Sequence, residues 1–185
     1  MTKHMKKYLA LAAFTLTSTT ALANDLYLDV SNDTFHGRID ATNSSSGVNY
    51  LAEALLNDED GSVFNLGVMK TGRLNNQNVI GGLGVKFMYL DTDADNYLAL
   101  SLGGSLSFAF PNLPDTRLVT ELFYAPSVTT TDDLDNVVDF NLRLEYQLFE
   151  NGNIYGGVRL LQVENEFDVE HEIDDGFFIG IKLSY

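Results

Sequence analysis

The last ten residues, Gly176-Phe177-Phe178-Ile179-Gly180-Ile181-Lys182-Leu183-Ser184-Tyr185, decide the fold. Successive side chains of a strand point to opposite sides, so this stretch has two different faces. One face carries Phe177, Ile179, Ile181, Leu183 and Tyr185, and the other carries Gly180, Lys182 and Ser184. Strands of membrane β-barrels carry apolar residues outward toward lipid, small or polar residues inward, and aromatic residues at the membrane interface. The stretch therefore predicts the closing strand of a transmembrane β-barrel.

The same alternation recurs along the chain, most clearly at Asn136 to Phe149 and Tyr97 to Phe110, and no segment has a sustained helical period. We predict an all-β, antiparallel transmembrane barrel of about ten strands: Asp25–Ser31, Thr34–Ala41, Gly47–Leu56, Ser62–Lys70, Val79–Leu90, Tyr97–Phe110, Thr116–Pro126, Asn136–Phe149, Asn153–Glu164 and Gly176–Tyr185. The division of the first two at Asn32-Asp33 is the weakest step. Because such barrels need an even number of strands, the alternative is eight, with part of the N-terminal region outside the barrel.

The loops support ten strands. With that number, the acid-rich connections 57–61, 91–96, 127–135 and 165–175 all fall at the end opposite the C-terminus, and the nearly neutral ones fall at the other end. A soluble β-sandwich or lipocalin-like barrel also alternates, but its apolar face points inward. The closing strand, the aromatic residues near strand ends and the small residues opposite the leucines favour the membrane.

The chain begins as exported proteins do. Residues 1–23 have a basic start, a short apolar core and the cleavage pattern Ala21-Leu22-Ala23, which predicts a signal peptide followed by one barrel domain over 24–185. Without Lys3, Lys6 and Lys7 the chain keeps 26 acidic and eight basic residues, a net charge of −18. This charge opposes binding to nucleic acid, whose phosphates need a basic footprint, so we predict no nucleic-acid partner. The chain has no cysteine, so it has no disulfides.

Most basic residues fall on the predicted inward faces, where acidic residues accompany them. A lipid-facing cation near the membrane midplane costs about 2 to 4 kcal/mol, so inward placement is expected. We predict a lumen charge network of Arg38, Glu53, Lys86, Arg117, Glu121, Asp139, Arg143, Glu145, Arg159 and Lys182. These groups either pair across a narrow lumen and fill it, or remain partly hydrated around a thin water column.

Other polar clusters predict no specific chemistry. The acidic segment 164–175 could collect divalent cations, but charge runs are usually solvated, so we predict no metal site there. The segment Asp91 to Asn96 lacks the glycine and the bidentate glutamate of a calcium-binding helix-loop-helix site. Two histidines, His36 and His171, remain after processing, and no nucleophile-elbow serine motif accompanies them. We therefore predict neither an enzyme nor a bound cofactor.

Several segments resemble one family, the YfaZ-type outer-membrane proteins of Gram-negative bacteria. The similar segments are Glu121 to Ser127, Asp135 to Leu148, Ile154 to Arg159 and Asp174 to Gly180. The resemblance implies a small barrel in the outer membrane and assigns no functional residues, because the family's function is not established. Its lipid partners would be outer-membrane lipid and lipopolysaccharide.

The C-terminus also resembles the signal that the barrel-insertion machinery recognises. Gly180, Leu183 and Tyr185 stand where that signal requires them, whereas Phe178 stands where a polar residue is usual. The resemblance implies that the insertion machinery and periplasmic chaperones are partners during biogenesis.

Two functions are compatible with these features. The first is a small porin-like channel in which the lumen charges set ion selectivity. The second is a non-conducting structural or surface-interaction barrel whose acidic extracellular loops contact cations, lipopolysaccharide or another cell surface.

Overall fold

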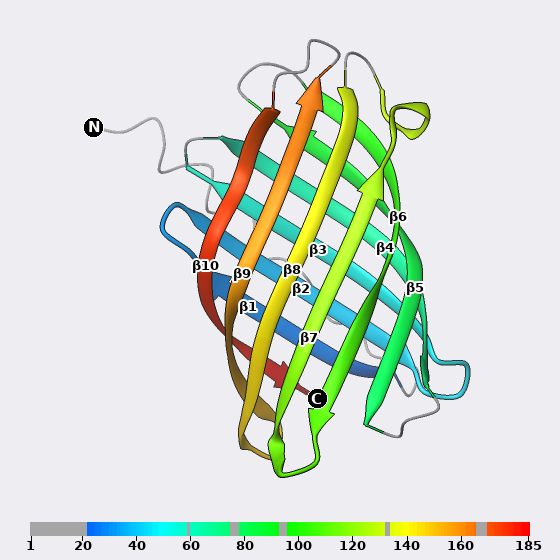
Figure 1. Ribbon diagram of the computed structural model, residues 1–185, viewed down its shortest axis with the longest axis vertical. Helices are drawn as coiled ribbons and strands as arrows, with labels where there is room; N and C mark the ends of the chain where they lie inside the picture. The colour runs from blue at the N-terminus through cyan, green and yellow to red at the C-terminus, as the bar shows by residue number, and fades with distance from the viewer. Residues whose placement is uncertain (1–21, 59, 75–77, 93–95, 132–133, 166–169) are drawn as a thin grey trace.

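The computed structural model describes residues 22–58, 60–74, 78–92, 96–131, 134–165 and 170–185. In these residues the chain forms a closed barrel in which each strand pairs antiparallel with its sequence neighbours and β1 closes against β10 (Figure 1). The strands are β1 (Leu22–Val30), β2 (Thr34–Asn43), β3 (Val48–Asn57), β4 (Gly61–Arg73), β5 (Val79–Asp91), β6 (Asn96–Phe110), β7 (Leu113–Ala125), β8 (Leu134–Phe149), β9 (Gly152–Asn165) and β10 (Glu170–Ser184). A short 3-10 turn, η3 (Ser127–Thr129), follows β7.

The prediction of ten strands is confirmed, and the alternative of eight is wrong. Strands β1 and β2 separate at Asn32-Asp33, where the backbone N–H of Ser31 donates to the carbonyl of Thr34 at 2.9 Å. The C-terminus lies at the lower end of the barrel in Figure 1. We call this end periplasmic, because barrels of this type have short periplasmic turns and longer extracellular loops.

The N-terminal boundary of the barrel lies near the predicted cleavage site. Strand β1 begins at Leu22, and residues 1–21 lie outside the described part of the chain. Asn24 and Tyr185 exchange two backbone hydrogen bonds of 3.1 and 3.0 Å, and the paired register of β1 with β10 runs from Asp25 to Val30. A chain that begins at Asn24 therefore keeps every one of these closing contacts.

The apolar face of the strands points outward. Leu66, Leu83, Leu102, Phe177 and Ile179 are all more than half exposed, and they alternate along their strands with buried or half-buried residues. A soluble β-sandwich or lipocalin-like barrel would bury this face, so that alternative is wrong. An apolar belt around a closed barrel is the exterior of a transmembrane barrel. In the described residues, no helix has the length and hydropathy needed to cross a membrane.

Leu66→Arg is expected to cost about 2 to 4 kcal/mol of folding free energy, because a cation near the bilayer midplane loses its hydration. Leu66 is 64% exposed and lies midway along β4. Leu113→Arg, at the periplasmic end of β7 and 57% exposed, should cost only about 0 to 1 kcal/mol. Urea unfolding from phospholipid vesicles measures both, and equal costs would contradict the membrane placement.

The interior has two layers of different chemistry. Near the extracellular end, apolar side chains fill the lumen. This apolar layer consists of Leu55, Val63, Met88, Leu90, Ala99, Ala125, Leu134, Val137, Leu161, Val163 and Ile173, all buried and in mutual contact. On its periplasmic side lies a layer of charged side chains, which is the candidate site.

Candidate functional site

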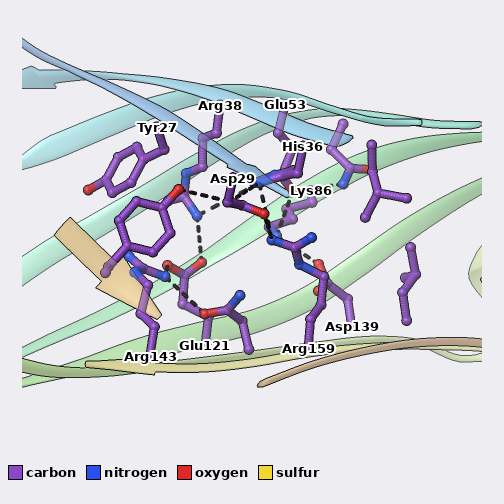
Figure 2. Close-up of a pocket in the computed structure, with 15 residues that line it drawn as sticks. Tyr27, Asp29, His36, Arg38, Glu53, Lys86, Glu121, Asp139, Arg143 and Arg159 are labelled. Carbon is purple, nitrogen blue, oxygen red and sulfur yellow. Dashed lines mark hydrogen bonds and ion pairs between the residues drawn. The ribbon is translucent and has the colours of Figure 1, made fainter. Parts of the chain in front are cut away.

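The charged layer is a continuous set of ion pairs that crosses the lumen. This charge network consists of Asp29, His36, Arg38, Asp40, Glu53, Lys86, Glu121, Asp139, Arg143, Glu145, Arg159 and Asp174. Each of these side chains occupies an inward position of its strand. Figure 2 shows members contributed by opposite walls of the barrel meeting across its interior.

One half of the network is built on Glu121, from β7. Its carboxylate accepts a hydrogen bond from Arg38 Nη1 at 2.7 Å and another from Arg143 Nη1 at 2.9 Å. Arg38 also donates from Nε and Nη2 to Asp40, at 2.7 and 3.0 Å, and Arg143 donates from Nε to Glu145 at 2.8 Å. Two guanidinium groups are thus held by three carboxylates, and the side chains are at most 8% exposed.

Lys86, from β5, joins the two sides of the lumen. Its ammonium donates to Glu53 on β3 and to Asp139 on β8, both at 2.8 Å. The ammonium also lies 4.3 Å from the centre of the Phe123 ring, a favourable cation–π distance. Glu53 accepts a further hydrogen bond from Asn65 Nδ2 at 2.7 Å, so Asn65 fixes the carboxylate that receives Lys86.

Asp29, from β1, is the centre of the other half. Its carboxylate accepts hydrogen bonds from Arg159 Nη2 at 2.7 Å and from the Tyr155 hydroxyl at 2.8 Å. His36 Nδ1 lies 2.8 Å from the same carboxylate. Arg159 also donates from Nη1 to Asp174 at 2.9 Å. His36 Nε2 lies 3.8 Å from Glu53, which connects this half to Lys86.

Aromatic rings pack against the cations in the lumen. The cationic groups of Arg38, Arg143 and Lys182 are 5.0 to 5.6 Å from the centre of the Tyr27 ring. The Phe178 ring packs edge-on against Tyr155, and Arg159 lies 4.6 Å from its centre. The phenylalanine at position 178, where a polar residue is usual, therefore packs inside the barrel and covers the guanidinium of Arg159.

The network contains more acids than bases. Seven carboxylates face four arginine or lysine side chains, and each of these four cations is shared by at least two carboxylates. His36 is the only other basic group among these twelve side chains. The lumen therefore carries excess negative charge at the level of the network.

The network encloses a small polar space. A cavity of about 40 Å³ lies among its side chains and is also lined by Asn65 and Asn141. The side-chain oxygen of Asn65 is buried and has no hydrogen-bond partner among the described protein atoms. A cavity of this size and polarity suits one or two water molecules.

Most residues of the predicted lumen charge network lie together. Eight of the ten, all except Arg117 and Lys182, belong to the network described above. Lys182 instead pairs with Asp25 at 2.9 Å, nearer the periplasmic end. Arg117 is exposed at that end and makes no ion pair with any described residue.

The predicted lumen charge network lacked four members of the network in the structure: Asp29, His36, Asp40 and Asp174. Asp29 alternates with Leu28 and Val30, so the strand pattern placed it inward and could have revealed it. Asp174 lay within the segment that was predicted to be a loop. Strand β10 begins at Glu170, and its register shifts between Glu172 and Asp174, which interrupts the alternation that the prediction needs.

The predicted insertion-signal residues lie at the closing seam. Gly180 pairs with Asp29 of β1 and Leu183 pairs with Leu26, while Tyr185 is more than half exposed beside the periplasmic end. The acidic segment 164–175 lies partly outside the described residues, as does Asp91 to Asn96.

Comparison with known proteins finds solved outer-membrane barrels of similar structure and one matching protein family. The KdgM porin is 13% identical, with a TM-score of 0.49, over 88% of this chain and 99% of that chain. The outer membrane channel DcaP of Acinetobacter baumannii is 12% identical, with a TM-score of 0.46, over 91% of this chain and 55% of that chain. No curated protein matches this sequence. The family model described as YfaZ precursor matches residues 5–185, nearly the whole sequence, so the chain belongs to the YfaZ family.

Proposed function

We propose that this protein is a small porin-like channel of the outer membrane of a Gram-negative bacterium, and that it passes small cations through a narrow, negatively charged constriction. The constriction is the charge network. Export by the signal peptide 1–23 precedes insertion, and residues 24–185 form the mature barrel. The transmembrane barrel and its family support the location.

The excess of carboxylates is the observation that carries this proposal. Uncompensated charge in a narrow interior is costly, because the protein offers little hydration there. Mobile cations that enter from either end would neutralise the excess. Rings of acidic side chains select cations in membrane channels for the same reason.

The apolar layer favours a second candidate, the non-conducting structural barrel. Met88, Leu90 and Val63 have no exposed surface, so this layer resists the passage of hydrated ions. In the channel proposal, conduction therefore requires these side chains to move apart, and single-channel conductance is small.

A reversal-potential measurement tests the channel and its selectivity together. The refolded mature protein is inserted in a planar lipid bilayer with a potassium chloride gradient across it. We expect a preference for potassium over chloride that is abolished by the triple substitution Asp139→Asn, Glu145→Gln and Asp174→Asn. This variant leaves four carboxylates facing four cations.

The control carries the same change in net charge outside the lumen. Asp33→Asn, Asp115→Asn and Glu150→Gln alter exposed residues at the two ends of the barrel. This control should keep the wild-type preference. An unchanged reversal potential in the lumen variant, or an equal shift in both variants, would contradict the role of the network.

A further inference from the structure

The lipid-facing surface of the barrel is hollowed at one place. A groove of about 980 Å³ follows the outside of β4 to β8 and is lined largely by apolar residues. Two rows of outward-facing cross-strand partners form it. One row is Lys70, Leu83, Gly104, Leu122 and Phe140, and the next is Gly72, Gly81, Leu106 and Thr120. We call this feature the exterior groove.

A missing side chain at Gly72 opens the hollow. The neighbouring Leu83 and Leu106 are 77% and 50% exposed and form its walls, while the Leu74 side chain covers Gly81. A Cβ atom added at Gly72 would meet no other atom within 4 Å, so open space lies directly above this residue. In a transmembrane barrel, this outward-facing apolar space lies within the hydrocarbon region, where lipid chains are the solvent.

The periplasmic mouth of the groove is cationic. Lys70 and Arg73 line it together with Thr71, and both cations are exposed. Neither makes an ion pair with any residue of the described chain. Of the eight cations after residue 23, three are exposed, Lys70, Arg73 and Arg117, and the first two lie at the same groove. The mature chain is otherwise strongly acidic, which makes a site with two neighbouring cations on its surface unusual.

We propose that the exterior groove binds one anionic phospholipid of the periplasmic leaflet, with its phosphate at Lys70 and Arg73 and an acyl chain over Gly72, between Leu83 and Leu106. Charge complementarity selects the anionic headgroup, since each basic residue near a membrane surface favours anionic lipid by about 1 kcal/mol. The groove favours an acyl chain, because the chain fills the gap at the protein surface and restores dispersion contacts to the residues that line it. This inference rests on the transmembrane placement of the barrel and is independent of ion conduction.

Native mass spectrometry of the mature protein, released from detergent after titration with defined lipids, tests the site. We expect one tightly bound phosphatidylglycerol in preference to phosphatidylcholine with the same acyl chains. Lys70→Gln or Arg73→Gln should weaken phosphatidylglycerol binding about fivefold, and the double variant about thirtyfold. Arg117→Gln removes a periplasmic-end cation outside the groove and should leave binding unchanged.

A second variant tests the groove itself. Gly72→Phe places a ring in the open space, where an added Cβ meets no atom within 4 Å, and should reduce phosphatidylglycerol binding while both cations remain. Gly37→Phe is its control on β2, because an added Cβ there meets only ordinary contacts with Leu28 and Phe35, at 3.6 and 3.9 Å. Inorganic phosphate should not displace the lipid, since it offers no acyl chain.

Three results would overturn the proposal. The first is equal binding of phosphatidylglycerol and phosphatidylcholine. The second is an equal loss of lipid in the groove variants and in the two controls, which would indicate non-specific lipid around the whole barrel. The third is a dimer that Gly72→Phe abolishes, which would mean that a second copy of the chain occupies the groove.

Discussion

Arg143→Ala destabilises the folded barrel by about 3 to 5 kcal/mol, the usual cost of removing one partner from a buried ion pair. The substitution leaves Glu145 without a cationic partner and removes one of the two guanidinium groups at Glu121. It also removes a cation from above the Tyr27 ring. Equilibrium unfolding in urea from phospholipid vesicles, followed by far-UV circular dichroism, measures the change.

The double variant Arg143→Ala and Glu145→Ala separates the ion pair from general packing. Removal of both partners leaves no unpaired carboxylate at position 145, so the double variant should be more stable than the sum of the single substitutions predicts. Arg117→Ala, at an exposed residue that makes no ion pair within the described part of the chain, should change stability by no more than about 0.5 kcal/mol. Strict additivity in the double variant would show that Arg143 and Glu145 do not act as a pair.

Met88→Ala combined with Leu90→Ala should increase single-channel conductance at least twofold, because it opens the apolar layer. Both side chains are fully buried and point into the lumen from β5. Large-to-small substitutions at such positions cost about 2 to 5 kcal/mol each, so the variant is also expected to be strongly destabilised. Planar-bilayer recordings measure the conductance, and urea unfolding measures the stability.

Leu100→Ala is the control for the apolar layer. Leu100 is 43% exposed on the lipid-facing side of β6, the strand that pairs with β5. Its truncation removes similar apolar atoms from the outside of the barrel and should not change conductance. If the lumen variant conducts as the wild type does while remaining folded, the apolar layer is not the barrier to ions.

The number of strands and the direction of their faces could be predicted from the sequence because both depend on local alternation. Val138, Phe140 and Leu142 face lipid, as the period of two requires, while Asp139 and Arg143 face the lumen. The lipid-facing pattern is strict because a charge on that face is costly at mid-membrane. Where β10 shifts register near Asp174, the alternation fails and so did the prediction.

The partners of the lumen charges could not be predicted from the sequence. Arg159 and Asp29 are separated by 130 positions, and Arg38 and Glu121 by 83. Alternation says which side a residue faces but not its height in the lumen or which residue lies opposite. Barrel closure and strand tilt set those heights, and they are properties of the whole sheet. The apolar layer was missed for a related reason, since Met88 and Leu90 lie on the same inward face as Lys86.

Single-channel recording of the mature protein in a planar lipid bilayer tests the central claim, that this barrel conducts small cations, most directly. The account predicts small, reproducible conductance steps that favour potassium over chloride and that grow in the Met88→Ala and Leu90→Ala variant. A barrel that is folded and inserted but remains electrically silent, in both the wild type and that variant, would contradict the channel and favour the structural barrel.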